Sequence, residues 1–522
     1  MTDRRRRSHL HLRKRYRAII SYTGMILLIC AGLMVAPLAC ALVWPSELRL
    51  APGFMGPALG LGAVGVTLWR VFRLREPTAL TTQQGSVIVV LSWMIACIAS
   101  AFPFMIVEGL GFTHGLFEAV SGWTTTGLSV IDVTQASHMT LIWRSLMQLA
   151  GGAGLAIIMV ASIAGPTGTG LAMAEGRSEQ LVPHVRASVK LVLTLYIGYA
   201  LVGVLAYWIA GMGLFDAINH SFAAVATGGF STRPESIGMW DEMRVEAVTI
   251  PLMLLGSLNF LTAWGLLRRR FQRATRSGEL RLVAVVIPVA ALLLFALVTG
   301  GLYAGEKAGR VAVFESVSAL TGTGFATVSY EEWSGFGLLI IVTLMCIGGG
   351  VGSTSGGIKQ YRVYVLLKSL FWKIRRAFLP PTTVFERWIW QGDYRDFIDE
   401  RRLRGIADYF FLYVGSLLVA TLVIAAAGFG LEESLFEAAS MLGTVGLSVG
   451  VTSANAPSAV LWTGIIAMFL GRLEFYVVVI GLVKLAVDVW KIAVPRRSPP
   501  TGPTGNDRDP TTDDSEQALS DE

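Results

Sequence analysis

Charged side chains are few in this chain: Asp, Glu, Lys and Arg make up only 15% of its 522 residues, whereas 53% are hydrophobic. A soluble domain carries about 25% charged residues. Together with the mean hydropathy of +0.59, this deficit excludes a water-soluble protein built around one core. The apolar surface must face lipid, because runs of about 20 apolar residues, enough to cross roughly 30 Å of hydrocarbon, recur along the whole chain.

Cysteine is also scarce, and its placement argues against a disulfide framework or a metal–thiolate site. The four cysteines lie inside apolar stretches without ligand spacing and are interpreted as buried free thiols: Cys30, Cys40, Cys97 and Cys346. The six histidines show no ligand pattern either. His220, in the second of four short helices predicted below, is interpreted as a structural group rather than a proton carrier.

Two kinds of catalytic or binding motif are missing. The chain has no H-E-x-x-H string and no nucleophile–base pair at spanning depth, which an intramembrane protease would need. It also lacks a G-x-x-x-x-G-K-[ST] phosphate loop, so control by a nucleotide would come from a partner protein. The net charge of +7 does not indicate nucleic-acid binding, since the basic residues mostly flank apolar segments. We therefore predict that the protein is not an enzyme.

The apolar runs predict ten membrane-spanning segments. Their approximate bounds are 18–44, 53–73, 83–108, 139–165, 188–211, 245–267, 281–304, 335–365, 403–429 and 457–487. Alternating sides place the basic clusters 4–17, 268–281 and 368–376 together, and the positive-inside rule makes that side cytoplasmic. Both termini are then cytoplasmic. The first run is too long for the core of a signal peptide, so we expect it to remain as a helix.

These segments predict an all-α integral membrane fold, in which four pseudo-repeated helix–pore loop–helix units surround a central pore and two extra transmembrane helices precede them. The expected divisions are a basic cytoplasmic tail (1–17), two N-terminal helices (18–75), pore repeats 1 (76–170), 2 (171–275) and 3 (276–376), a cytoplasmic connector (377–402), pore repeat 4 (403–493) and an acidic tail (494–522). The tail has too little apolar content to fold, so we expect it to be disordered.

A repeated pattern between pairs of spanning segments supports this division, since internal repeats in register are a strong signal of architecture. Its anchors are four glycines: Gly127, Gly228, Gly324 and Gly446. Nine residues before the anchors stand Glu118, Asn219, Glu315 and Glu437. A serine follows each glutamate by three residues: Ser121, Ser318 and Ser440. The second repeat, with Asn219 and Phe222 at these two positions, is the divergent copy.

Such loops favour a cation pore for physical reasons. Non-helical backbone is tolerated at membrane depth only where it is buried in protein or lines a watery cavity. A short helix before each anchor would point its partly negative C-terminus at the loop, and glycine lets carbonyls turn inward, where they can replace the water shell of K+. The glutamates are interpreted as caps near the N-termini of these helices rather than direct ion ligands. The alternative for the loops, close packing of helices on small residues, does not require four-fold register.

With these residues in view, the chain resembles the TrkH/KtrB/HKT superfamily of potassium transporters, and the TrkH branch most closely. The strings S-G-W-T-T-T-G, A-T-G-G-F-S-T, T-G-T-G-F-A-T and G-T-V-G-L-S, which begin at Ser121, Ala226, Thr321 and Gly443, look like the four filter loops of that family. The resemblance implies K+ binding at backbone carbonyls of Thr125, Thr126, Gly127, Ala226, Thr227, Gly228, Gly322, Thr323, Gly324, Thr444, Val445 and Gly446. A serine at the first anchor goes with sodium preference in the plant branch, so Gly127 favours potassium.

Two further strings match the family. Glycines crowd the segment 348–359, and at nearly 1 kcal/mol each relative to Ala they predict an unwound stretch; the resemblance implies an intramembrane gating loop below the filter, while a flexible packing kink is the alternative. In G-R-L-E, from Gly471, the resemblance places Arg472 beside the permeation path. An internal pair with Glu474 is awkward, because residues two apart do not face each other on a helix, and a partner on another helix is possible. The implied gate residues are Gly348, Gly349, Gly350, Gly352, Ser353, Thr354, Ser355, Gly356, Gly357, Lys359 and Arg472.

The sequence therefore predicts potassium uptake through a single-chain four-fold pore, driven by the membrane potential. Co-transport of H+ or Na+ is left open, as is a sodium-selective or non-selective cation transporter as the alternative function. A secondary transporter for an organic solute would show two inverted halves with broken helices, which four-fold register disfavours. The resemblance implies a bacterial plasma membrane location, a homodimer and a cytosolic nucleotide-binding regulatory subunit of the TrkA type.

Overall fold

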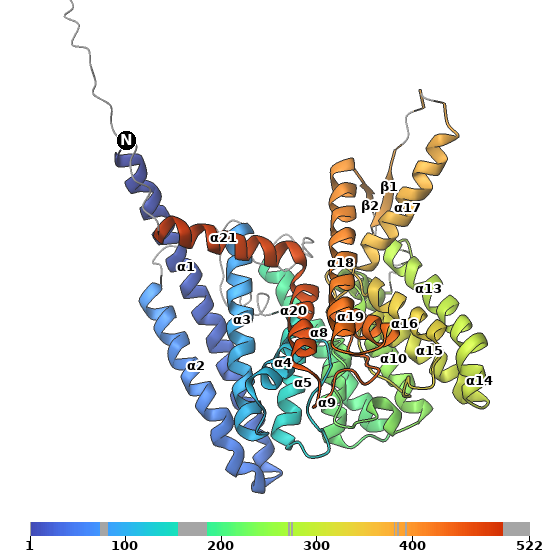
Figure 1. Cartoon of the computed structure of the whole chain (residues 1–522), viewed down its shortest axis with the longest axis horizontal. Helices are drawn as coiled ribbons and strands as arrows, with labels where there is room; N and C mark the ends of the chain where they lie inside the picture. Colours follow the sequence, from blue (N-terminus) through green and yellow to red (C-terminus); the bar gives the residue numbers. More distant parts are fainter. Residues whose placement is uncertain are drawn as a thin grey trace, which may run out of the picture.

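The computed structural model describes residues 2–73, 82–154, 185–269, 272, 275–380, 382–383, 386–391 and 394–493. Within these ranges the regular structure is helical apart from one two-stranded hairpin. Six of the described helices are long and apolar enough to cross a membrane, and a bent helix pair adds a possible seventh crossing. Most long helices run along one direction (Figure 1), as expected for an integral membrane bundle.

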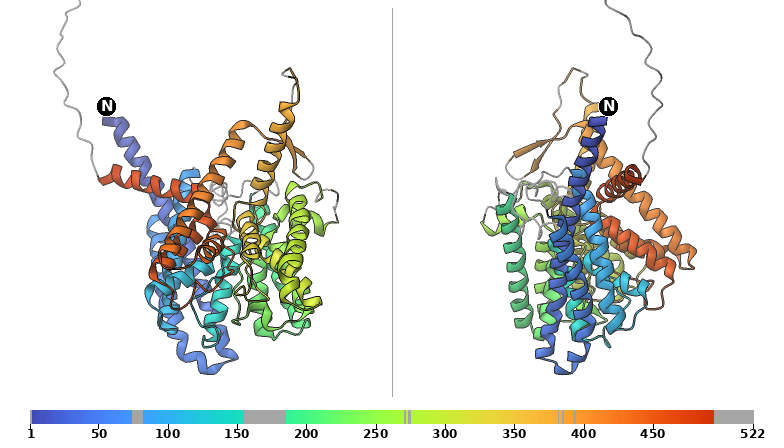
Figure 2. Two further views of the ribbon diagram at one scale, coloured as in Figure 1. Left: turned by 45° about the vertical axis from the view of Figure 1, so that its right-hand side comes forward. Right: turned by 90° about the vertical axis from the view of Figure 1, so that its left-hand side faces the viewer.

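The first two long helices form an antiparallel pair. They are α1 (Thr2–Val35) and α2 (Ala51–Phe72), joined by the short helices η1 (Ala36–Leu42) and η2 (Pro45–Leu50). Gly24 and Gly65 bring the two backbones together, because a Cβ on either would crowd the carbonyl oxygen of the other. The pair packs against α3 (Thr82–Val107), and the three helices stand side by side in both views of Figure 2.

Four units of one plan follow, each with a long outer helix, a short helix, a loop and an inner helix. Unit 1 contains α3, α4 (Phe112–Trp123) and α5 (His138–Ala153). Unit 2 contains α8 (Val185–Ile209), α9 (Leu214–Val225), η3 (Ser236–Met239), α10 (Met243–Ser257) and α11 (Phe260–Leu267). Unit 3 contains α13 (Gly278–Leu294), the π-helical η4 (Phe295–Thr299), α14 (Gly300–Leu302), α15 (Glu306–Thr321), α16 (Gly335–Ile347) and α17 (Gln360–Ala377). Unit 4 contains α18 (Glu400–Ala426), α19 (Leu431–Gly443), α20 (Ser458–Leu473) and α21 (Phe475–Ala493).

The short helices α4, α9, α15 and α19 end inside the protein. Each follows a glycine N-cap: Gly111, Gly213, Gly305 and Gly430. α4 and α9 have 12 residues each, and at about 1.5 Å per residue they cannot cross a membrane. Apolar side chains anchor the short helices in the core: Phe117 of α4, Phe314 of α15 and Phe436 of α19 are fully buried. The loops that follow therefore begin deep within the bundle, where irregular backbone is tolerated.

The inner helices are not the continuous spans that hydropathy predicts. α5 ends at Ala153, α10 stops before α11, and α16 stops before α17. α20 and α21 meet at an angle of 103° around Glu474. The break escapes a hydropathy average because apolar residues lie on both sides of it. The end of the predicted span 139–165 lies outside the described residues. The uninterrupted spans are Tyr16–Leu42, Pro45–Phe72, Gln83–Val107, Lys190–Ile209, Gly278–Leu302 and Glu400–Ala426.

One end of the molecule carries most of the structure outside the bundle. The connector between units 3 and 4 forms the hairpin β1 (Trp388–Gln391) and β2 (Tyr394–Phe397), with Trp388 opposite Phe397. α17, this hairpin and the start of α18 extend beyond most of the other helices, at the end where the N-terminal part of α1 also projects (Figure 1). α21 lies across the long helices and is seen end-on in the right-hand view of Figure 2. The predicted acidic tail lies outside the described residues.

Candidate ion-conducting site

The loops that follow α4, α9, α15 and α19, termed loops 1 to 4, meet inside the bundle. Four glycines mark the meeting point and are termed the ring glycines: Gly127, Gly229, Gly324 and Gly446. Their φ angles of 99°, 71°, 80° and 100° lie in the region that favours glycine. A Cβ on each would overlap a carbonyl oxygen of the next loop, from loop 1 to 2, 2 to 3, 3 to 4 and 4 to 1. The four loops therefore close into one ring.

The oxygens that face these glycines, termed the ring carbonyls, reveal the register of the loops. They belong to Thr126, Gly228, Thr323 and Val445. Gly228 thus takes the place of the threonine, and Gly229 takes the place of the anchor glycine. Hydrogen bonds agree, because Gly228 N donates to Ala223 O at 2.8 Å just as Thr126 N donates to Ser121 O at 2.9 Å. The predicted register of loop 2 is wrong by one residue, since two adjacent glycines leave it ambiguous in the sequence.

With the register corrected, His220 stands where the other units carry a glutamate. His220 Nε2 lies 2.9 Å from Ser231 Oγ, and the matching pair in unit 1 joins Ser129 Oγ to Glu118 Oε1 at 3.0 Å. The other ring nitrogen, Nδ1, lies 2.8 Å from the carbonyl oxygen of Asp216. His220 is fully buried, and these contacts agree with its interpretation as a structural group.

The predicted capping role of the three glutamates is wrong. Glu118, Glu315 and Glu437 are fully buried near the middle of their helices. Each carboxylate instead accepts a backbone hydrogen bond from the chain beyond the ring glycine, and the donors are Val130 N at 3.0 Å, Thr327 N at 2.8 Å and Thr452 N at 2.8 Å. Because a buried charge needs such donors, the glutamates hold loops 1, 3 and 4 to their own short helices.

Loop 2, which His220 contacts at Ser231, is also held from unit 1. Two buried side chains of α5, Arg144 and Gln148, reach it. Arg144 Nη1 donates to Ser231 O at 3.1 Å, while its Nε pairs with Glu118 at 2.7 Å. Gln148 Nε2 donates to the ring carbonyl of Gly228 at 2.5 Å. Neither residue is among the sequence-predicted site residues. An arginine inside an apolar segment is nevertheless a signal in the sequence, because charge at membrane depth is costly and usually functional.

The glycine-rich segment 348–359 lies against the four loops on their inner-helix side. Its contacts fall at the residue two before each ring glycine. Thr354 O accepts from Thr125 Oγ1 at 3.4 Å, and Thr354 Oγ1 lies 2.9 Å from Thr227 Oγ1. In loops 3 and 4 the residues at this position lie against the segment too: a Cβ on Gly322 would overlap Ser355, and one on Gly356 would overlap Thr444. One segment of unit 3 therefore contacts all four loops.

Broken inner helices anchor this segment. Gly350 N donates to Ser257 O at 2.8 Å, and Thr354 Oγ1 donates to Gly256 O at 2.9 Å, both at the end of α10. Arg472 of α20 donates to Thr354 O and, at 2.6 Å, to Gly151 O of α5. The segment is thus unwound, as the glycines predict. It is tied directly to α10 and α20, and through Arg472 to α5.

Arg472 and Glu474 do not pair with each other. Arg472 binds the backbone carbonyls described above, whereas Glu474 pairs with Arg362 of α17 at 2.7 Å. The guanidinium of Arg362 also lies 3.9 Å from the ring centre of Tyr409. Lys359, buried at the end of the segment, donates to Ser355 O. Glu474 therefore has its partner on another helix, the arrangement that the sequence left open.

Comparison with known proteins assigns the chain to a family. A family model described as the TrkH cation transport protein matches residues 63–488. The chain belongs to the TrkH family. The Trk system potassium uptake protein TrkH of Escherichia coli is 30% identical over 89% of this chain and 98% of that protein, and its relative TrkG is 32% identical over 77% and 84%. The crystal structure of the potassium transporter TrkH from Vibrio parahaemolyticus superposes with a TM-score of 0.77 and 26% identity, covering 89% of this chain and 98% of that one.

On its other side, the ring of this TrkH family member opens into a cavity of about 670 Å³, which all four ring glycines line. Asp132 and Arg233 lie among its polar lining residues. Hydrogen bonds from the side chain and backbone of Thr134 lower the pKa of Asp132, so this exposed carboxylate stays charged at the mouth. Among the described residues, no cluster of His, Cys, Asp and Glu could hold a metal ion.

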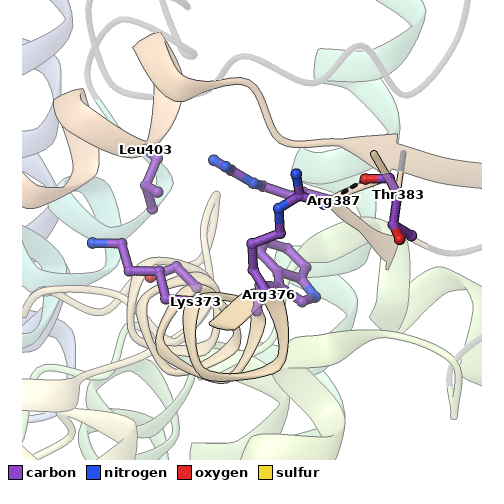
Figure 3. A pocket seen from close by; sticks show the side chains of 7 residues that line it. Lys373, Arg376, Thr383, Arg387 and Leu403 are labelled. Atoms are coloured by element: carbon purple, nitrogen blue, oxygen red, sulfur yellow. Dashed lines mark hydrogen bonds between the residues drawn. The ribbon is translucent and has the colours of Figure 1, made fainter. Parts of the chain in front are cut away.

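A second cavity, of about 330 Å³, lies where α17, the lead-in to the hairpin and α18 meet. Its basic lining residues are Lys373, Arg376 and Arg387 (Figure 3). Arg376 donates to Thr383 O, and Arg387 pairs with Glu400 at 3.6 Å. The end of the TrkH-family bundle that carries the N-terminus therefore also presents a basic pocket.

Proposed function

We propose that this protein takes up K+ through the ring of loops 1 to 4. The single observation that carries the proposal is the closed ring, in which each ring glycine faces a carbonyl oxygen of the next loop. Carbonyl oxygens can replace the water shell of a dehydrated K+ ion. The names of the Escherichia coli relatives, potassium uptake proteins, support the choice of ion.

The ion binds at the backbone of three consecutive residues in each loop. In loops 1, 3 and 4 these residues are the ones that the sequence predicts: Thr125, Thr126, Gly127, Gly322, Thr323, Gly324, Thr444, Val445 and Gly446. In loop 2 the corrected register gives Thr227, Gly228 and Gly229, and Ala226 moves to the edge. Four short helices end just before these residues, and the partial negative charge of each C-terminus favours a cation at the centre.

The membrane potential drives uptake, at about 2.3 kcal/mol per charge per 100 mV. The segment 348–357, together with Lys359 and Arg472, acts as the gate, because it lies against all four loops and is held by hydrogen bonds that can be exchanged. Opening requires Thr354 to leave Thr227 and the carbonyl of Gly256.

We propose that the protein lies in the bacterial plasma membrane with both termini in the cytoplasm. The basic clusters of the chain support this orientation under the positive-inside rule. The basic pocket of Lys373, Arg376 and Arg387 then faces the cytosol, where a TrkA-type nucleotide-binding subunit would dock on it, and two copies of the chain form a homodimer. Light scattering of the purified protein tests the dimer, and uptake measured with and without the co-expressed subunit tests the regulation.

Growth at limiting K+ tests the proposed function. Cells that lack their own K+ uptake systems receive the wild-type chain or Gly127→Ser, together with a regulatory subunit. We expect the wild type to rescue growth and the serine variant to lose its preference for K+ over Na+, because a side chain would enter the ring. A wild-type protein that inserts into the membrane and yet fails to rescue would overturn potassium uptake and favour the sodium-selective or non-selective alternative.

A further inference from the structure

Gln148 is a side chain of α5 that binds loop 2 at the ring. It is fully buried, and both ends of its amide contact loop 2. Nε2 donates to Gly228 O at 2.5 Å, and Oε1 accepts from Phe230 N at 3.2 Å. These two bonds fix the peptide groups on both sides of the ring glycine Gly229. The loop is thereby clamped by a side chain that belongs to another unit.

The clamped oxygen is one of the four ring carbonyls. Among the described residues, the equivalent oxygens of Thr126, Thr323 and Val445 accept no hydrogen bond, whereas Gly228 O accepts one from Gln148. A carbonyl that accepts an amide hydrogen bond is held in direction and shares its lone pairs with the donor. The ring is therefore asymmetric at the very atoms that a cation would contact.

Residue types at matching positions show that this asymmetry is built into the sequence. Gln148 is the eleventh residue of α5, and the eleventh residues of the other inner helices are buried methionines: Met253, Met345 and Met468. A glycine follows three residues later in all four units: Gly151, Gly256, Gly348 and Gly471. The equivalence of the four positions thus stands on the helix starts and on these glycines independently.

A second substitution in loop 2 makes room for the glutamine. The ring carbonyl belongs to a threonine or valine in the other loops but to Gly228 here. A Cβ at Gly228 would overlap the amide of Gln148. Glutamine on the helix and glycine in the loop are therefore complementary, and both depart from the pattern of the other three units together.

We propose that Gln148 is a specificity-determining residue, which holds the Gly228 carbonyl in its place in the ring and thereby sets the preference of this transporter for K+ over Na+. The inference deepens the proposed function and rests on it. Gln148 acts by positioning the loop. Selectivity depends on how many carbonyls face the ion and on their field strength, so the release of one carbonyl out of four alters the ring directly.

The test replaces Gln148 by the residue of the other units. Gln148→Met keeps the volume and removes both hydrogen bonds, whereas Gln148→Glu keeps the acceptor for Phe230 N and removes the amide donor. Tyr207→Phe is the matched control, since it removes a buried hydrogen bond of unit 2, to Thr249 at 2.9 Å, that does not touch the loop. K+ and Na+ uptake into proteoliposomes is measured at fixed membrane potential, and thermal unfolding of each purified variant reports folding.

We expect Gln148→Met and Gln148→Glu to lower the K+/Na+ preference about tenfold, which corresponds to about 1.4 kcal/mol and to the net worth of a single hydrogen bond. The half-saturating K+ concentration rises while the maximal rate is kept, and Tyr207→Phe retains the wild-type preference. A folded Gln148→Met with the wild-type preference overturns the inference, as does an equal loss in Tyr207→Phe. If Gln148→Met does not fold, Gln148→Glu decides by the same measurements.

The same measurements distinguish a failure of the inference from a failure of the proposed function. A wild-type protein that carries K+ and Na+ equally well contradicts both the proposed potassium function and the inference. If the wild type prefers K+ and Gln148→Met shows the same K+/Na+ preference, only the inference is contradicted. The double variant Gln148→Met/Gly228→Thr is expected to recover part of the lost preference, because it gives loop 2 the pairing of methionine and threonine that loops 1 and 3 carry.

Discussion

Glu118 and Arg144 form an ion pair inside the bundle, with 2.7 Å between Oε1 and Nε and side-chain exposures of 0% and 2%. The pair links loop 1 to loop 2, because Glu118 also binds Val130 N and Arg144 also binds Ser231 O. Arg144 further lies 3.9 Å from the ring centre of Phe230. Neither loop can move without the other as long as both charges stay paired.

Removing one partner of this pair is expected to destabilise the protein strongly. Arg144→Met leaves Glu118 as an uncompensated buried charge, which costs about 3–5 kcal/mol. The double variant Arg144→Met/Glu118→Gln recovers much of that loss, because no lone charge remains. Arg233→Met is the control, since the Arg233–Asp216 pair is 3.1 Å long with Arg233 46% exposed and is worth at most about 1 kcal/mol. Chemical or thermal unfolding in detergent measures all three, and equal losses in Arg144→Met and Arg233→Met would contradict the prediction.

Thr354→Ala is expected to raise K+ flux in the absence of a regulatory partner. The substitution removes the hydroxyl that contacts Thr227 and Gly256 and leaves the backbone oxygen to Arg472. Two net hydrogen bonds of about 0.5–1.5 kcal/mol each favour the closed segment, so the basal flux rises about tenfold or more. Thr343→Ala is the control, because its exposed hydroxyl binds only Leu339 O within α16. Flux assays in proteoliposomes decide, and an unchanged or lower basal flux in Thr354→Ala argues against the proposed gate.

The corrected register of loop 2 predicts that Gly229→Ala abolishes selective K+ uptake. The new Cβ would overlap Thr323 O of loop 3, in addition to the strain at a φ of 71°. Gly109→Ala isolates the strain, since Gly109 has a φ of 69° and nothing within 4 Å of a Cβ. That control costs about 1–2 kcal/mol of stability and retains uptake. Uptake and unfolding are measured side by side, and a selective Gly229→Ala protein would show that the ring glycine of loop 2 lies elsewhere.

Asp241 forms an acid-sensitive contact at the surface of the protein. Hydrogen bonding from Lys307, at 2.7 Å, and then the charges of Lys307 and Arg310 lower the pKa of Asp241 from its ordinary value of 3.8. A lowered folded-state pKa means that the carboxylate stabilises the fold above pH 3.8 and loses this effect as the pH falls further. Asp241→Asn should therefore unfold at a temperature that depends less on pH between about 5 and 3. The stabilisation that Asp241 contributes is small, under about 1 kcal/mol, because the pair is half exposed. Identical pH profiles of the wild type and Asp241→Asn would rule out the contact.

The sequence pattern was sufficient for much of the architecture. Apolar runs give the membrane fold, and the recurring glycine strings give four loops because the same backbone geometry must be made four times. The unwound segment 348–359 also follows from composition, since so many glycines cannot stay helical at membrane depth. The glutamates were found by their spacing, but their role was misjudged: distance along a helix does not say whether a carboxylate turns toward its own N-terminus or toward the next loop.

Local sequence patterns determined which segments form helices and loops, and only the tertiary structure decided which of their residues contact one another. Periodicity and repeat spacing fix the helices, the loops and the family of this chain, because they depend on neighbours in sequence. The choice between Gly228 and Gly229, the bracing of loop 2 by Arg144 and Gln148, and the breaks in the inner helices depend on contacts between units. Such contacts are set by the close approach of backbones from distant segments, which leaves no periodic trace in the chain.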